Sequence, residues 1–461
     1  GTYGPLRQRK SMKKRIGLYS RRCFVRGKLE EAIVFTAHGK ITEVRKGRKI
    51  FADEAVQDYG DAVMMPGVID AHVHINEPGR TNWEGFETAT KAASFGGTTF
   101  LVDMPLNSSP VTTDAKALAL KLKAASNKTL VHCGFYGGLV PSNLSEIPAL
   151  IEAGVLGIKT FLVHSGIDEF PNARLDDLDK IMPLLAKADL PLLVHCEIPD
   201  GTGGFSDYSD PHRYQHYLNS RPPSWEVNAI AAVIALCAKH NCKTHIVHVS
   251  ASESLPLIEV AKKDGLPLTA ETCAHYLYFS AEEIPDSEPI YKCAPPIRTQ
   301  ANNHKLIAAL KTGVLDFITS DHSPAPAEVK SLESGNFKTA WGGISGLQSL
   351  LPASWTALKD EFSLEDFIPL LTEKPAKFIG LFPQKGVLQE GSDADFVVWQ
   401  PEIPFILKQE NLQYRHKFSP YLGKRFLGNI IATYVLGENV IHHRPNTLNK
   451  GTCILRKFKK S

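Results

Sequence analysis

The sequence has 461 residues, of which 43% are hydrophobic and 22% are charged, and this composition is typical of a globular protein with a sizeable core. No apolar run is long enough to span a bilayer, which favours a water-soluble protein without a membrane partner. The formal net charge is +3, but residues 1–28 hold ten of the 52 Lys and Arg and no Asp or Glu. The rest of the chain therefore carries 42 basic and 49 acidic residues, a balance that argues against a nucleic-acid-binding protein.

The chain opens on a basic segment that contains "RQRKSMKKR". We expect residues 1–15 to form a solvated, disordered tail or an artificial extension, with a targeting segment such as a mitochondrial presequence as the alternative. The eight cysteines are scattered and include no C-x-x-C pair. Reduced thiols are therefore expected, and they indicate an intracellular location, with the cytoplasm favoured and the mitochondrion as the alternative.

Residues 16–65 consist of short β-like segments separated by turn residues, and residues 384–461 have the same character. These two flanks bracket the central part of the chain. We expect them to assemble into one small β-sandwich domain formed from both chain ends.

Residues 66–383 alternate short apolar runs with helix-like stretches every roughly 30 to 40 residues, a rhythm typical of βα units and a parallel sheet. Eight units close a (β/α)₈ TIM barrel, whereas an open doubly wound sheet more often stops near six strands. We therefore expect an α/β fold with a closed barrel, in which the first and last strands are neighbours. The eight expected strands are residues 68–74, 98–105, 129–137, 155–163, 190–197, 244–250, 266–273 and 315–322.

The first barrel strand ends on His72 and His74, with Asp70 one step deeper. Positions i and i+2 of a strand point to the same face, so the two imidazoles lie side by side. They also stand at the C-terminal end of the strand, where active sites of this fold occur. A metal site and two polar residues satisfied within the protein are both open interpretations of this pair alone.

Three later strands end on similar side chains, because His195, His248 and Asp321 occupy comparable positions on the fifth, sixth and eighth strands. Imidazoles and a carboxylate on one rim suit a divalent ion such as zinc, and we prefer this interpretation to a chance set of core histidines. Lys159 ends the fourth strand, where a protonated amine would repel a cation. A lysine carbamylated by carbon dioxide would be an anion able to bridge two metals, but the residues alone favour a salt-bridged lysine.

The chain resembles the cyclic amidohydrolases, from about residue 16 into the late 440s. This resemblance implies a TIM barrel of the amidohydrolase type with a flanking β-sandwich, hydrolysis of a cyclic amide and assembly into a homotetramer. It is carried by "GVIDAHVHINEPGRTNWEGFETATKAASFGGTT", "DMPLN", "GIKTF", "LVHCE", "HVSASES", "PPIR", "SDHSP", "AWGGISGLQ" and "YRHKFSPYLG".

The resemblance also implies two divalent metal ions, with zinc expected. The first two histidines would bind one ion and the later two the other, and carboxylated Lys159 would bridge them. A hydroxide between the ions would attack the ring amide, and Asp321 would act as general base and then general acid. The implied ligands are His72, His74, Lys159, His195, His248 and Asp321.

Two departures from relatives bear on the substrate. Dihydroorotase-like members have Arg, which pairs with a carboxylate, where this chain has Asn76. Dihydropyrimidinase-like members have an oxyanion-binding Tyr where this chain has His164, which is either a replacement donor or a surface residue of its loop. Both departures favour a ureido-hydantoin, allantoin, which ring opening converts to allantoate. Asn107 and the backbone near Cys293 and Gly343 are further expected substrate contacts.

Two alternatives stay open. The chain could be a hydantoinase-like or dihydropyrimidinase-like hydrolase of another cyclic ureide. It could also be a non-catalytic scaffold that keeps the fold and loses the metals, although all six implied ligand positions hold competent residues.

Overall fold

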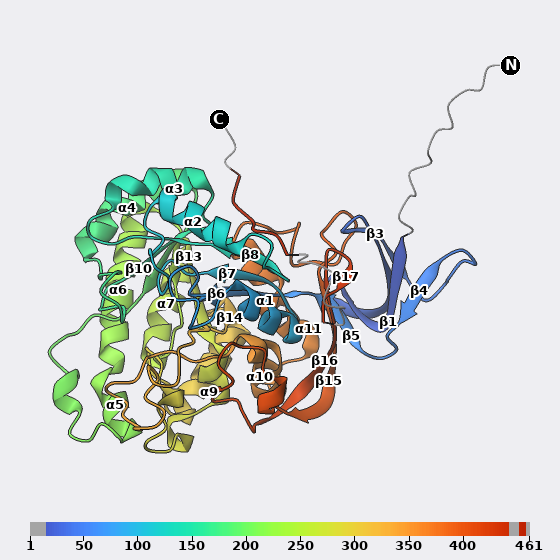
Figure 1. The fold of residues 1–461 in the computed structure, drawn as a ribbon. Coiled ribbons are helices and arrows are strands. Elements are labelled where there is room, and N and C mark those ends of the chain that lie inside the picture. Colours follow the sequence, from blue (N-terminus) through green and yellow to red (C-terminus); the bar gives the residue numbers. More distant parts are fainter. Residues whose placement is uncertain (1–14, 442–450, 458–461) are drawn as a thin grey trace.

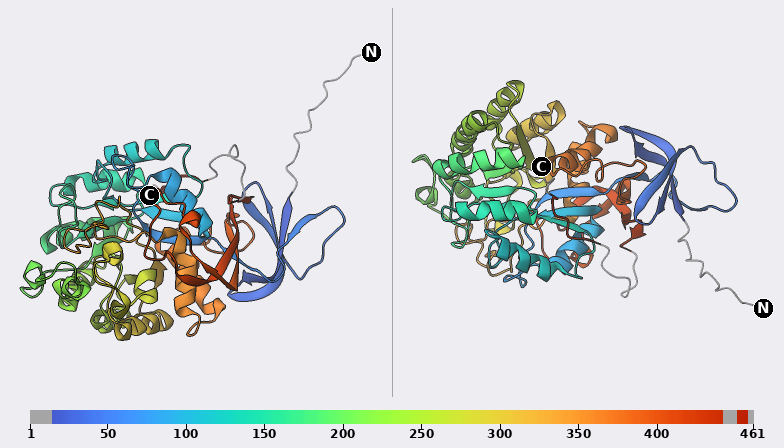
Figure 2. Two further views of the ribbon diagram at one scale, coloured as in Figure 1. Left: turned by 60° about the horizontal axis from the view of Figure 1, so that its bottom comes forward. Right: turned by 90° about the horizontal axis from the view of Figure 1, so that it is seen from above.

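The computed structural model describes residues 15–441 and 451–457 (Figure 1). Nearly all of the expected basic tail, residues 1–14, lies outside the described residues. None of the helices in the described ranges is long and apolar enough to cross a membrane. The views in Figures 1 and 2 show a barrel ringed by helices and, beside it, a sheet that combines the blue and the red ends of the chain.

The central part of the chain forms the closed parallel barrel that the sequence predicts. The third strand is interrupted at Tyr136, so that β8 continues as the two-residue β9. Successive strands pair in chain order, and the last strand meets the first through a parallel bridge between Val73 and His322. The barrel strands are β6 (Val68–Val73), β7 (Thr98–Asp103), β8 (His132–Phe135), β9 (Gly137–Gly138), β10 (Ile158–Phe161), β11 (Leu192–His195), β12 (Thr244–Ile246), β13 (Leu268–Cys273) and β14 (Phe317–Thr319).

Helices cover the outside of the barrel (Figure 1). Local capping explains where several begin: the Asp114 side chain accepts a hydrogen bond from Ala117 N, and the Thr299 side chain accepts one from Asn302 N. The helices are α1 (Phe86–Phe95), α2 (Ala115–Ala125), α3 (Ile147–Ala153), α4 (Leu175–Ala188), α5 (Tyr214–Ser220), α6 (Pro223–His240), α7 (Leu255–Lys263), α8 (Ala274–Tyr278), α9 (Gln300–Thr312), α10 (Leu350–Leu358), α11 (Leu364–Phe367) and α12 (Glu373–Phe378).

Strands from both chain ends form the expected β domain. Hydrogen bonds join them into one eight-stranded sheet in the order β17-β16-β15-β5-β1-β2-β3, with β4 paired to β1. The two chain ends meet where Met64 of β5 pairs with Val398 of β15. The strands are β1 (Ile16–Val25), β2 (Lys28–Ala37), β3 (Lys40–Lys46), β4 (Ala55–Asp58), β5 (Val63–Pro66), β15 (Phe396–Ile406), β16 (Arg425–Val435) and β17 (Glu438–Asn439).

Residues 451–457 lie against the barrel, although the sequence analysis assigned residues 384–461 to the β domain. Cys453 forms a parallel bridge with Cys133 of β8, and Cys133 N donates to Thr452 O at 3.0 Å. The chain therefore returns from the sheet to the third strand of the barrel.

A buried carboxylate joins the two parts of the molecule. Asp395, just before β15, accepts hydrogen bonds from Lys385 Nζ at 2.5 Å, from His132 Nε2 of β8 at 3.1 Å and from Leu436 N at 2.9 Å. Burial alone would raise the pKa of Asp395, but His132 and Lys385 hold it well below its usual range. The carboxylate is thus charged in the folded protein and bound by groups from both the barrel and the sheet.

We predict that Asp395→Asn lowers the free energy of unfolding by about 3 kcal/mol at pH 7, because it removes one of the two carboxylates, Asp393 and Asp395, that pair with the buried Lys385. The pKa of Asp395 is lower in the folded than in the unfolded chain, so its stabilising effect is present above about pH 4 and is lost as pH falls below that value. Urea unfolding should therefore show a gap between wild type and variant that narrows in acid. Equal stability of Asp395→Asn and the exposed-site control Asp360→Asn at pH 7 would contradict this assignment.

Candidate metal centre

All six side chains that the sequence proposes as metal ligands line one cavity of about 740 Å³. The histidines and Asp321 stand near or just beyond the C-terminal ends of barrel strands, where active sites of this fold occur, and Lys159 lies within the short strand β10. The residues are His72, His74, Lys159, His195, His248 and Asp321.

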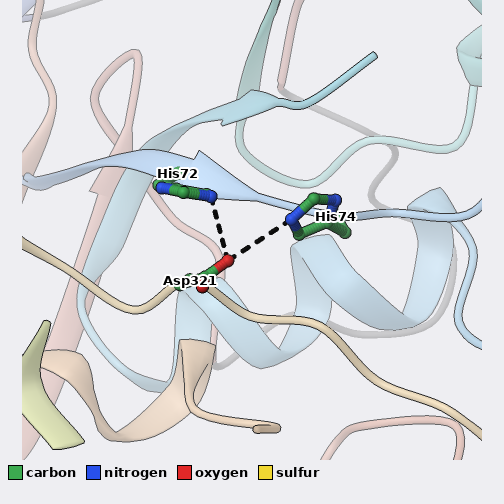
Figure 3. Close-up of side chains that lie close together, drawn as sticks. All are labelled: His72, His74 and Asp321. Carbon is green, nitrogen blue, oxygen red and sulfur yellow. Dashed lines mark ion pairs between the residues drawn. The ribbon is translucent and has the colours of Figure 1, made fainter. Parts of the chain in front are cut away.

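Three of these residues form a tight cluster (Figure 3). Asp321 Oδ1 lies 2.9 Å from His72 Nε2 and 3.3 Å from His74 Nε2. Their possible ligand atoms all lie within 4.8 Å of one another. The two histidines come from the end of β6, and Asp321 follows β14, so closure of the barrel brings them together.

The other two histidines lie next to this cluster. The ring centroids of His195 and His248 are 4.5 Å apart, and those of His248 and His72 are 5.5 Å apart. His248 Nδ1 is buried and has no hydrogen-bond partner among the described residues. Burying a nitrogen without a hydrogen-bond partner costs free energy. Because this nitrogen lies beside four other possible metal ligands, it indicates that the site binds an ion.

Lys159 is fully buried and lies in the same cavity. Its Nζ is 3.7 Å from Met104 Sδ and 4.9 Å from the centroid of the Phe161 ring. In the described part of the chain no carboxylate lies within ion-pair distance of it, so the salt-bridged lysine that the residues alone favoured is not found. Burial lowers the pKa of Lys159 to about 8, although Asp321 and Glu271 oppose this effect. Roughly a tenth of the amine is therefore uncharged at pH 7, far more than for an ordinary lysine.

An ionised carboxylate and a neutral imidazole in the cluster suit a cation, whereas His72 must first lose a proton. Burial lowers the pKa of His74 to about 4, so this imidazole is neutral near pH 7 and can offer a lone pair. Burial would do the same to His72, but Asp321 and Glu271 raise its pKa to about 9. The pKa of Asp321 is well below its usual range because the neighbouring histidines outweigh its burial. Imidazole nitrogens around an ionised carboxylate are ligands that zinc and similar divalent ions prefer, so the residues fit such a metal.

The sequence analysis did not identify the carboxylate that orients His72. Glu271 Oε2 lies 3.0 Å from His72 Nδ1 and accepts a hydrogen bond from Thr319 Oγ1, while Glu271 Oε1 lies 2.8 Å from His245 Nε2. Glu271 therefore holds the Nδ1 proton of His72 and leaves Nε2, which faces Asp321, as the nitrogen that a metal would bind. The available signal was Glu271 itself, a charged residue within the seventh expected strand.

A second carboxylate, also not assigned from the sequence, orients His195. Glu197 Oε1 lies 2.6 Å from His195 Nε2, and Arg221 Nη2 donates to the same oxygen at 2.6 Å. Glu197 is fully buried, and Arg221 compensates its charge. His195 is thus held through Nε2, which leaves Nδ1 as its remaining metal-binding nitrogen.

The expected substrate-binding asparagines have different positions. Asn107 lines the cavity, but its Nδ2 lies 3.2 Å from His74 Nδ1, so it also positions a histidine. Its Oδ1 has no partner among the described residues. Asn76 is buried outside the cavity lining, where its Nδ2 donates to Asn107 O at 3.2 Å. Asn76 therefore supports Asn107 and does not itself line the cavity.

The remaining expected contacts lie at the rim. His164 lines the cavity, but its Nδ1 accepts from Gly166 N and its Nε2 lies 3.1 Å from Asp168 Oδ1, so its own loop engages both nitrogens. This arrangement supports the surface-residue interpretation. Cys293 and Gly343 are buried behind the wall, whereas their neighbours Ala294 and Gly342 line the cavity.

Comparison with known proteins places these features in context. A model of the amidohydrolase family matches residues 63–437. The chain is 45% identical over 405 residues to an allantoinase of Arabidopsis thaliana, covering 84% of this chain and 79% of that protein. It is 43% identical over 427 residues to an allantoinase of Streptomyces avermitilis, covering 92% and 95%.

Two further similarities concern compartment and fold. The chain is 41% identical over 373 residues to a protein of Aquarana catesbeiana named "Allantoinase, mitochondrial", covering 80% of this chain and 76% of that protein. Among solved structures, the L-hydantoinase (dihydropyrimidinase) of Arthrobacter aurescens has a TM-score of 0.88 at 29% identity, covering 96% of this chain and 100% of that one.

We predict that Glu271→Gln weakens Zn²⁺ binding by about 10- to 100-fold, because a single amide oxygen cannot accept from both His72 and His245. Competition with a chelator of known affinity measures the change without any enzyme assay. The control is Glu253→Gln, a change of the same kind at an exposed position. Wild-type affinity in Glu271→Gln would contradict the orienting role of this carboxylate.

Proposed function

The chain belongs to the amidohydrolase family, and we propose that it hydrolyses the hydantoin ring amide of allantoin to give allantoate. The observation that carries this function is the set of four histidines, a lysine and an aspartate around one cavity, in a chain similar to curated allantoinases. An intact donor set is not expected of a non-catalytic scaffold. The similarity to allantoinases favours allantoin over other cyclic ureides as the substrate.

The family and the cluster of His72, His74 and Asp321 imply a divalent metal site. We propose that the site takes two ions, that zinc is the metal, and that Lys159 bridges them as N6-carboxylysine. His195 and His248 would hold the second ion. When bound, such a pair supplies hydroxide near neutral pH and polarises the scissile carbonyl.

The chain's own residues would move the protons. Asp321 lies at hydrogen-bond distance from both histidines of the cluster, and we propose that it takes the proton of the attacking water and delivers it to the ring nitrogen as the carbon–nitrogen bond breaks. The water oxygen then belongs to the new carboxylate. This assignment gives one carboxylate the roles of general base and general acid in successive steps.

Contacts to the substrate are proposed on both sides of the cavity. Asn107 offers a buried amide oxygen without a partner among the described residues, which suits a ring N–H of the hydantoin. The main chain near Cys293 and Gly343 would contact the ring from the cavity wall, whereas His164 at the rim would contact the ureido group only if its loop released one of its ring nitrogens. Asn76 would act through Asn107.

We propose a homotetramer inside the cell, in the cytoplasm or, as the alternative, in the mitochondrion. All eight cysteines are unpaired, as a reducing compartment requires. The tetramer rests on the resemblance of the chain to its family.

The decisive experiment compares ring opening of allantoin with that of dihydroorotate, dihydrouracil and unsubstituted hydantoin. We expect kcat/KM to be highest for allantoin, by at least about 100-fold over the others. Buried polar groups of the site that hydrogen-bond allantoin would have no partner when an analogue lacking the matching group is bound. Preference for hydantoin or dihydrouracil would support the alternative hydrolase. Inactivity of the zinc-loaded protein on all four substrates would support a scaffold.

We predict that Asp321→Asn lowers kcat by about 10²- to 10⁴-fold, because the amide cannot accept the proton that the carboxylate accepts. The fold should be kept, because Asn has nearly the same shape as Asp, and circular dichroism of the variant checks this. Steady-state kinetics and elemental analysis of the same preparation separate loss of proton transfer from loss of metal. Near-normal turnover would refute the role of Asp321.

We predict that reactivation of metal-free protein by zinc requires bicarbonate, because bicarbonate supplies the carbon dioxide that carboxylates Lys159. Carbon dioxide adds only to the uncharged amine. The pKa of this amine is about 8, so the rate of reactivation should rise with pH through that value. Mass measurement of the native protein without acid should show the added carbon dioxide on wild type, because acid would release it. Lys159→Arg is the control, and equal reactivation without bicarbonate would contradict carboxylation.

A further inference from the structure

A fully buried hydrogen bond between a histidine and a glutamate lies directly behind Asp321. His322 Nε2 is 2.7 Å from Glu84 Oε1, and both side chains are inaccessible to solvent. His322 Nδ1 accepts a hydrogen bond from Gly346 N at 3.2 Å, so the ring carries its proton on Nε2 and donates it to Glu84. The ring is therefore fixed at both nitrogens.

The main chain of His322 is tied to the metal cluster. His74 N donates to His322 O at 2.8 Å, and His322 N donates to Ser320 Oγ at 3.1 Å. Asp321, between these two residues, has a φ of 44°, which a residue with a side chain adopts only at a cost in free energy. Contacts on either side must hold Asp321 in this conformation, and the fixed ring of His322 supplies one of them.

Glu84 is itself held by two distant segments. Its Oε2 accepts hydrogen bonds from Arg415 N at 2.8 Å and Thr88 Oγ1 at 2.6 Å. Its main-chain oxygen accepts one from Arg415 Nε at 2.6 Å. The ring of Tyr414 packs on His322 with centroids 4.8 Å apart. Glu84 therefore links the loop before α1, the loop after β14 and the segment before β16.

These contacts bring together three sequence motifs that contain residues without a role as metal ligands. Glu84 belongs to "NWEGF", His322 to "SDHSP", and Tyr414 and Arg415 to "YRHKFSP". None of these four residues lines the cavity, so none of them can contact substrate there. A buried carboxylate with three donors, next to a strained catalytic residue, is instead suited to fix the geometry of that residue.

We propose that Glu84 and His322 are positioning residues for the reaction: their hydrogen bond fixes the backbone around Asp321 and thereby aims its carboxylate at His72 and His74. The inference rests on the proposed function of Asp321. Because His322 O also binds His74 N, the pair acts on a metal ligand and on the proton-transfer group at the same time.

A matched pair of variants tests the proposal. In His322→Gln the side-chain amide reaches the place of Nε2 and still donates to Glu84, whereas in His322→Asn the amide oxygen replaces Nδ1 as acceptor and the bond to Glu84 is lost. We expect kcat of the zinc-loaded enzyme to fall by less than about 10-fold in His322→Gln and by about 100-fold in His322→Asn, with KM within a factor of about three of wild type.

A merely structural role predicts a different result. Equal kcat values in the two variants, or a loss confined to KM, would overturn the proposal, as would a loss of kcat that only follows the fraction of folded protein in thermal unfolding. If neither His322 variant folds, Glu84→Gln decides: kcat lowered by at least 10-fold in folded protein supports positioning, and wild-type kcat overturns it.

Zinc affinity gives a readout independent of allantoin. Chelator competition should show weaker Zn²⁺ binding in His322→Asn than in His322→Gln, because only the former frees the segment that binds His74 N. If wild type binds zinc but does not open allantoin, the proposed function is wrong. The difference in Zn²⁺ affinity between the two variants then still tests the positioning role of Glu84 and His322. Equal affinities would then overturn the positioning role.

Discussion

Closure of the barrel is the constraint on which the rest of the site depends. The last strand lies beside the first, so Asp321 meets two histidines that precede it by almost 250 positions. A hydrogen bond from His74 N to His322 O makes the contact at the level of the main chain. An open sheet of the same strands would separate Asp321 from His72 and His74, and no choice of side chains could restore the cluster.

Buried carboxylates provide the second level of organisation. Glu271 holds His72, Glu197 holds His195, and Glu84 holds His322. Each is fully buried and each has at least one further donor, so the cost of placing its charge in the interior is offset by hydrogen bonds. Two imidazoles that face the cavity, those of His72 and His195, are thus backed by carboxylates that fix both tautomer and orientation.

The sequence predicts the barrel strands and the set of side chains around the cavity because both follow from local rules: apolar runs mark strands, and function gathers at their C-terminal ends. The carboxylates behind the histidines depend on pairing between strands distant in sequence, which no local pattern reports. Asn76 shows a further limit. It follows the second histidine by two positions, but its φ of 72° belongs to the left-handed region and the side chain lies off the cavity wall. Residues 451–457 carry no signal that they return to β8.

The sheet shared by the two chain ends has a consequence for synthesis. During translation β5 leaves the ribosome some 330 residues before β15, the strand with which it pairs, so one edge of the nascent sheet stays open while the whole barrel is made. Exposed strand edges recruit other chains, and a polypeptide truncated before β15 would keep that edge permanently unsatisfied. Premature termination should therefore yield aggregates in place of an isolated, soluble barrel.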